Sequence, residues 1–113
     1  MNNWSSGKNL RYDERYKVKN ISVLAKRARQ AFLEYSPIRF DAARPRIYRR
    51  IPYGPLLDLF VVDLRSYRGA NNYNRQLRES AETPYFGNEQ IRWLQQELQA
   101  SRAVWKVIAC DMP

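Results

Sequence analysis

An apolar segment that ends in charged residues is the strongest constraint on the fold of this chain. It reads LLDLFVVD from Leu56 to Asp63 and continues directly as LRSYR to Arg68. A strand that is apolar on both faces is typical of a sheet covered by helices. In such sheets anionic ligands bind at the carboxyl ends of the strands. The sequence therefore predicts an anion site around Asp63, Arg65 and Arg68, unless an Asp–Arg pair simply completes the strand end.

Composition indicates one basic globular domain. The chain has 113 residues, 20 Lys and Arg against 11 Asp and Glu, and a formal charge of +9. Such an excess attracts polyanions, phosphate esters or anionic surfaces, although a basic surface without a dedicated partner is an equal alternative. There is no histidine, so the usual general base and the commonest metal ligand are missing.

The single cysteine excludes an internal disulfide and a cysteine-based zinc cluster. No run of 18 apolar residues is present, which predicts no membrane span. The first residues also lack the apolar core of a signal peptide.

Residues 21–35 form a predicted amphipathic helix. Asn20 or Ser22 is positioned to cap its start, and Pro37 is expected to end it. Residues recurring at three- and four-residue steps give its apolar stripe: Ile21, Leu24, Ala28, Ala31, Phe32 and Tyr35.

An antiparallel hairpin is predicted next. Residues 46–52 alternate with arginine on both faces, which suggests an edge strand where arginine stays solvated. The turn 52–55 leads into the strand that ends at Asp63. Residues 69–84 then form a long loop of the kind that is commonly functional or mobile.

A second helix begins at Gly87-Asn88, with a stripe of Ile91, Leu94 and Leu98 that Trp93 widens, and with Glu97 facing water. Residues 104–110 read as a second buried strand, with Cys110 as a small core residue, before Asp111. The expected fold class is α/β with about two main helices and three strands.

Six residues are candidates for binding phosphate or metal. Arg65 and Arg68 have the geometry to clamp phosphate oxygens. Asp63 is suited to hold an arginine or help bind a cation, and Asp111 to bind a metal, although an aspartate there is more often a turn residue. Asn2 and Asn3 offer amide groups to a metal or a phosphate, with a flexible terminus as the alternative.

Several segments in the same order resemble the alkaline phosphatase D (PhoD-like) family of metallophosphatases. They cover nearly the whole chain, and each is modest alone. The segments are Asn2-Asn3-Trp4, ARQAFLEYSP from Ala28 to Pro37, Ile47-Tyr48-Arg49, the stretch from Gly54 to Arg68, Phe86 to Gln90 with Trp93-Leu94, and Ser101 to Ile108.

The resemblance implies a hydrolase of phosphate mono- and diesters that uses iron and calcium in a four-layer αββα sandwich. It implies attack by a metal-held hydroxide, with Asn2 or Asn3 at the metal–phosphate site. It also implies that Arg65 and Arg68 face that site and that Asp111 is a metal ligand. For the full-length family it implies a periplasmic or secreted location.

The family's upstream aspartate and cysteine ligands and its downstream Asp-x-His pair are missing from this sequence. Residues 1–113 are therefore expected to be an internal segment of a single catalytic domain, inactive without the remainder of that domain. The expected partner is a phosphate ester, and nucleic acid is not expected.

Two alternatives of other classes remain open. A small basic nucleic-acid-binding module would use the Arg44–Arg50 tract and the eight tyrosines, but the basic residues are spread over helix, strand and loop. A scaffold domain without a ligand is the other alternative.

Overall fold

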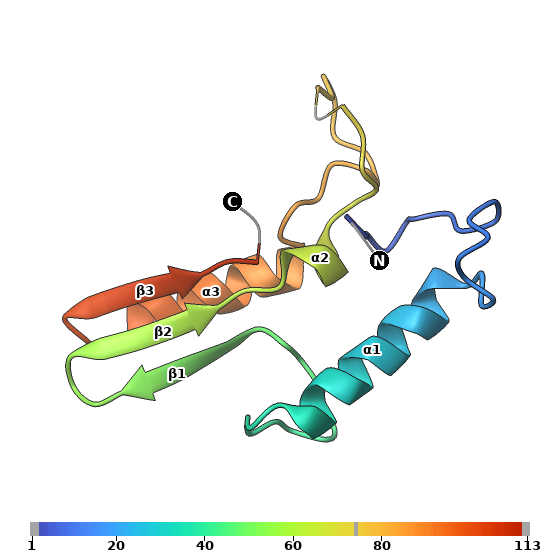
Figure 1. Ribbon diagram of the computed structural model, residues 1–113. Helices are drawn as coiled ribbons and strands as arrows, with labels where there is room; N and C mark the ends of the chain where they lie inside the picture. The colour runs from blue at the N-terminus through green and yellow to red at the C-terminus, as the bar shows by residue number, and fades with distance from the viewer. Residues whose placement is uncertain (1–2, 74, 112–113) are drawn as a thin grey trace.

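Three strands form one mixed sheet, and three helices lie around it (Figure 1). This computed structural model describes residues 3–73 and 75–111. The predicted α/β class is confirmed, but the short second helix was not expected. In chain order the elements are α1 (Ile21–Tyr35), β1 (Arg49–Tyr53), β2 (Leu57–Val61), α2 (Leu64–Tyr67), α3 (Asn88–Ala100) and β3 (Trp105–Ala109).

The sheet has the order β1-β2-β3. β1 pairs antiparallel with β2, with Arg49 opposite Val61, which confirms the predicted hairpin. β2 pairs in parallel with β3, with Val61 opposite Ala109. Because parallel strands end at the same edge of a sheet, the carboxyl ends of β2 and β3 lie together.

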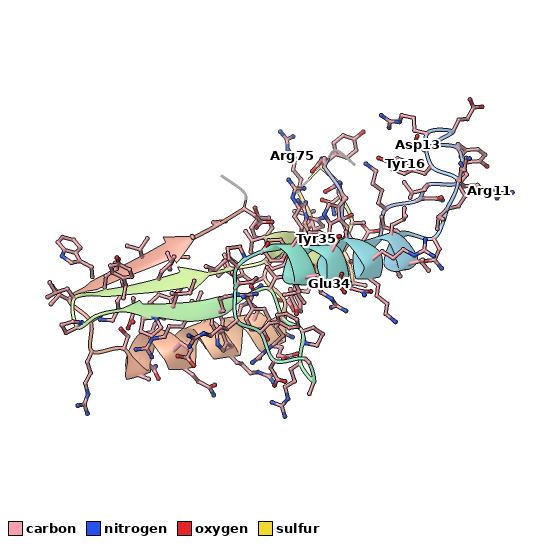
Figure 2. All side chains as sticks on the ribbon, turned by 60° about the horizontal axis from the view of Figure 1, so that its bottom comes forward. Arg11, Asp13, Tyr16, Glu34, Tyr35 and Arg75 are labelled. Carbon is pink, nitrogen blue, oxygen red and sulfur yellow. The ribbon has the colours of Figure 1, made fainter. Side chains whose placement is uncertain are left out.

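Only one face of the sheet carries a helix within the described residues. α3 lies along this face, as both views show (Figures 1 and 2). Asp58 and Phe60 of β2 point to it and are buried. The opposite face is apolar and open, with Trp105 exposed by 68% and Val107 by 44%.

The prediction of a buried strand over residues 104–110 is therefore wrong, because β3 has exposed side chains from Trp105 to Ile108. Cys110, predicted to lie in the core, is exposed as well. The exposure of β3 follows from its place in the sheet. Among the described residues β3 has a strand neighbour on one side only, and no layer covers the open face of the sheet.

α3 has the predicted start but a different buried face. Gln90 is fully buried, whereas Ile91 is 39% exposed. Glu97, expected to face water, accepts a hydrogen bond from Arg50 Nη1 at 3.2 Å. Polar contacts at both ends of α3 thus orient it on the sheet, and the predicted stripe is only partly buried.

An ion pair lies between α3 and the sheet. Arg50 Nη2 is 2.7 Å from Asp58 Oδ2, and the Ser101 hydroxyl donates to the same carboxylate. The hydrogen bond from Ser101 and then the one from Arg50 hold the pKa of Asp58 below its usual value. Arg50 was predicted to stay solvated on an edge strand. β1 is an edge strand as predicted, and the Arg50 side chain keeps 27% exposure while its guanidinium reaches over the sheet to a buried acid.

α1 is confirmed at both ends. The Asn20 side chain accepts hydrogen bonds from the amides of Ser22 and Val23, and the helix ends before Ser36. However, Leu33 is the one buried residue of this helix. Four residues of its predicted apolar stripe line an open groove of about 520 Å³ instead of a packed core: Ile21, Leu24, Ala28 and Phe32.

No helix in the described part of the chain is long and apolar enough to cross a membrane.

The Asp58 ion pair predicts acid sensitivity. The lowered pKa of Asp58 means that the unfolded chain takes up this proton at a higher pH than the folded one. The corresponding stabilisation is present above the usual value of 3.8 and is lost as the pH falls through the folded pKa. Asp58→Asn should therefore lower stability at pH 7 and flatten the loss of stability in acid.

Urea unfolding followed by circular dichroism between neutral and acid pH measures this effect. Glu14→Gln, at an exposed carboxyl, serves as the matched control. An unchanged slope of stability against pH in Asp58→Asn would contradict the role of this pair.

Candidate functional site

The carboxyl ends of β2 and β3 are joined by hydrogen bonds. The Val62 amide donates to the Ala109 carbonyl at 3.0 Å, and the Leu64 amide donates to Asp111 Oδ1 at 3.1 Å. Asp111, which follows β3, therefore lies against the first residue of α2. The two strand ends that the sequence marked as polar meet at one edge of the sheet.

Asp63 begins α2. Its backbone is extended, and its Oδ1 accepts a hydrogen bond from the Ser66 amide at 2.9 Å. This is the usual arrangement of an N-cap aspartate. The sequence carries a local signal for it in the Asp-x-x-Ser spacing, which our sequence analysis did not use. The side chain is buried, so this carboxylate has a structural role in addition to any functional one.

Gln90 of α3 fixes the backbone of Asp63. Its Oε1 accepts from the Asp63 amide at 2.7 Å, and its Nε2 donates to the carbonyls of Asp63 at 3.1 Å and Phe86 at 2.7 Å. Sequence reasoning missed this residue as part of the site. One available signal is a polar side chain four residues before Leu94, at the spacing of the apolar stripe.

Arg65 and Asn3 are brought together from opposite parts of the sequence. Arg65 Nη1 donates to Asn3 Oδ1 at 2.6 Å and lies 3.4 Å from the Trp4 carbonyl. Both residues were predicted to bind substrate, and the structure places them in direct contact. Asn2, predicted as a metal ligand, lies outside the described residues.

Asp63, Arg65 and Asp111 line one recess of about 440 Å³. Trp4 and Cys110 also line it, so the recess sits between the N-terminal segment and the ends of β2 and β3. Three of the residues predicted to meet at this edge, Asp63, Arg65 and Asp111, therefore lie together. Their functional roles stay predictions.

Arg68 lies apart from this recess. It is buried, with its guanidinium 5.6 Å from the centre of the Tyr85 ring. Its carbonyl accepts a hydrogen bond from the Ser6 hydroxyl at 3.2 Å. This placement makes Arg68 part of the packing between three chain segments. Its role as a phosphate ligand stays a prediction.

The described residues do not by themselves fit a metal centre. Residues 3–73 and 75–111 contain no group of three or more His, Cys, Asp or Glu side chains that could hold an ion. At the recess, Asp63 and Asp111 are the acidic residues, and one oxygen of each accepts a backbone hydrogen bond. A single calcium ion takes six to eight oxygen ligands. Iron or calcium at this edge would therefore need ligands from outside this set.

The charges of the recess limit what it can bind. An anion that approaches Arg65 also meets the carboxylates of Asp63 and Asp111. Two negative charges outweigh one guanidinium, so strong anion binding requires further positive charge near the carboxylates. A cation held between them and the anion would supply it. The arrangement is suited to binding an anion together with a cation.

The sequence is similar to known phosphatases. The family model described as PhoD-like phosphatase matches residues 1–113. Alkaline phosphatase D of Bacillus subtilis (strain 168) is 33% identical over 92 residues, which cover 73% of this chain and 16% of that protein. The chain thus spans about a sixth of the length of this curated relative. No solved structure gives a significant match.

Replacing Gln90 should loosen the site at Asp63. Gln90→Met keeps the size of the side chain but leaves the buried amide and carbonyl of Asp63 without these partners. We expect a loss of about 2 kcal/mol of unfolding free energy, because buried polar groups left unpaired carry their full desolvation cost. Chemical denaturation measures it, with Gln95→Met on the exposed side of α3 as the control. Equal stability of the two variants would show that the contact contributes nothing.

Proposed function

Because the chain belongs to the PhoD-like phosphatase family, we propose that it forms part of the active site of an enzyme that hydrolyses phosphate esters. The single observation that carries the proposal is the recess at the strand ends, where Asp63, Arg65 and Asp111 come together. We propose that residues 1–113 are one segment of a single catalytic domain. Both phosphate monoesters and phosphodiesters are candidate substrates.

Arg65 is the proposed phosphate ligand. Nη1 of its guanidinium is directed to Asn3 and the Trp4 carbonyl, and a guanidinium carries further N–H donors in the same plane. Such a fork suits two oxygens of one phosphate. Asn3 orients the fork by accepting from Nη1. Arg68 remains the predicted second phosphate ligand.

Asp63, Asp111 and Asn2 are the proposed metal ligands that this chain contributes. Carboxylate and amide oxygens suit hard cations such as calcium. Iron and calcium are the ions that the resemblance implies, and the remainder of the domain would have to supply the other ligands. In this proposal the chain binds the phosphate and supplies some of the metal ligands, and the other ligands come from the remainder of the domain.

The remainder of the catalytic domain is the proposed partner of the open sheet face. The radius of gyration of the chain is 16.2 Å, whereas a compact domain of this length has about 13 Å. The open face carries Ile51, Leu59, Trp105 and Val107, and an apolar surface of this kind is usually covered by another layer. A second sheet packed there would give the four-layer αββα sandwich. We also propose a periplasmic or secreted location for the full-length protein.

The alternative of nucleic-acid binding gains no support from the basic tract at residues 44–50. Arg46 donates to the Tyr48 hydroxyl, and Arg49 donates to three backbone carbonyls. Arg50 is paired with Asp58 and Glu97. These arginines serve the fold and do not present a continuous cationic surface to a polyanion.

Arg65→Gln should weaken phosphate binding. Titration of the chain with inorganic phosphate in the presence of a low concentration of calcium, followed by NMR at physiological salt, should give a dissociation constant about tenfold higher in this variant, because a charge-assisted hydrogen bond is lost. Arg92→Gln, at an exposed position of α3, makes the same charge change and should bind phosphate as tightly as the unmodified chain does. Equal weakening by both variants would mean that only net charge matters.

The chain alone should show negligible hydrolysis of p-nitrophenyl phosphate, with or without added iron and calcium. The physical reason is that the described residues contain no group of three or more His, Cys, Asp or Glu side chains placed to hold a metal ion. Initial rates of p-nitrophenolate release test this expectation. Robust metal-dependent turnover by the purified chain would contradict the proposed division of the site.

A further inference from the structure

Asn3 is contacted by α2 and by the loop that follows α2, both of which are distant from it in sequence. Its side-chain oxygen accepts from Arg65 of α2, and its backbone carbonyl accepts from Asn71 Nδ2 at 2.8 Å. Asn71 belongs to the loop between α2 and α3. Asn3 is thus bonded on one side to the proposed phosphate ligand and on the other side to this loop.

The backbone of Asn3 explains why such support is needed. Its φ of 47° makes it the one non-glycine residue with positive φ among the described residues. Asparagine tolerates this left-handed conformation better than most residues, but it does not favour it over the extended one. The hydrogen bond from Asn71 to the Asn3 carbonyl holds the peptide in this orientation. The orientation in turn directs Oδ1 of Asn3 towards Arg65.

The loop that carries Asn71 is closed at its base. The Gly69 amide donates to the Pro84 carbonyl at 2.7 Å. A Cβ atom at Gly69 would collide with the backbone carbonyl of Glu82, so this close approach of the two loop strands requires glycine. Figure 1 shows the loop leaving the sheet edge beside the N-terminal segment, and Figure 2 shows Arg75 farther out along it.

The N-terminal segment is also held to the start of this loop. The Ser6 hydroxyl donates to the Arg68 carbonyl, and Gly7 lies against Ala70 so closely that an added Cβ would come within 3.2 Å of the Ala70 Cβ. The backbone just before Asn71 is therefore held in place. Its amide group can transmit that anchoring to Asn3.

We propose that Asn71 is a positioning residue for Arg65, acting through Asn3. The proposal rests on the proposed function, in which Arg65 binds phosphate. Asn71 lies in the hydrogen-bond chain two steps from the guanidinium, and no contact between Asn71 and the phosphate is required. Because the three residues are exposed or half-buried, the loss of one of these hydrogen bonds is a small perturbation. The expected effects on binding are correspondingly modest.

The test uses Asn71→Leu in the full chain, which keeps the branched shape but removes the donor. Gln76→Leu is the matched control, because Gln76 is an exposed amide residue in the same loop. Two NMR signals are followed. The first reports the rate at which the Arg65 guanidinium rotates about its Nε–Cζ bond. This rotation is slow while Nη1 stays hydrogen-bonded to Asn3. The second is the shift of the Arg65 Nε resonance during titration with inorganic phosphate in the presence of a low concentration of calcium.

The expected result for Asn71→Leu is faster rotation of the Arg65 guanidinium and a phosphate dissociation constant about three- to tenfold higher, from the loss of one hydrogen bond. Gln76→Leu should change neither signal. Gly69→Ala, which forces the loop base apart, should reproduce the faster rotation. A mere loss of loop stability without a link to Arg65 would leave the rotation unchanged.

An unchanged rotation rate of the Arg65 guanidinium in Asn71→Leu would overturn the inference, whether or not the phosphate dissociation constant changes. The proposed function fails differently. If phosphate together with calcium does not shift the Arg65 signal even in the unmodified chain, Arg65 is not a phosphate ligand. Faster rotation in Asn71→Leu would then still show that Asn71 positions Arg65.

Discussion

Parallel pairing between β2 and β3 brings Asp63 and Asp111 to one edge of the sheet, although more than forty residues separate them in sequence. The register that sets Val61 opposite Ala109 also lets the Leu64 amide reach the Asp111 carboxylate. A shift of one residue would turn the side chains of β3 to the other face of the sheet. The candidate site therefore depends on this register more than on any single side chain.

α3 is held on one side of the sheet through polar contacts to β1, β2 and the start of α2. At one end Gln90 binds the backbone of Asp63, and at the other Glu97 and Ser101 reach the Arg50–Asp58 pair. The buried groups among these, Gln90, Asp58 and Ser101, would carry a desolvation cost without their partners, and this favours one position of α3 on the sheet. The same contacts place the start of α2, and with it Arg65, beside the N-terminal segment.

Much of the fold was predictable, because the local signals were strong. The helix from Ile21 to Tyr35 has a capping asparagine before it and a proline after it. The hairpin has the turn residues Gly54 and Pro55 between its strands. Burial was less predictable. β3 is apolar yet exposed, since none of the described residues cover the open face of the sheet, and α2 was missed although Asp63 and Ser66 have the spacing of a helix cap. Gln90 was also missed, because a glutamine on a helix normally faces water.

The sequence alone determined the family, the strand order along the chain and the polar residues that close each strand, since these follow from local pattern and from similarity. Tertiary structure alone decided which of these residues meet. It joined Arg65 to Asn3 and turned Arg68 onto Tyr85, although the two arginines are three residues apart. The physical reason is that a side chain's partner depends on contacts between distant segments, and no local pattern encodes them.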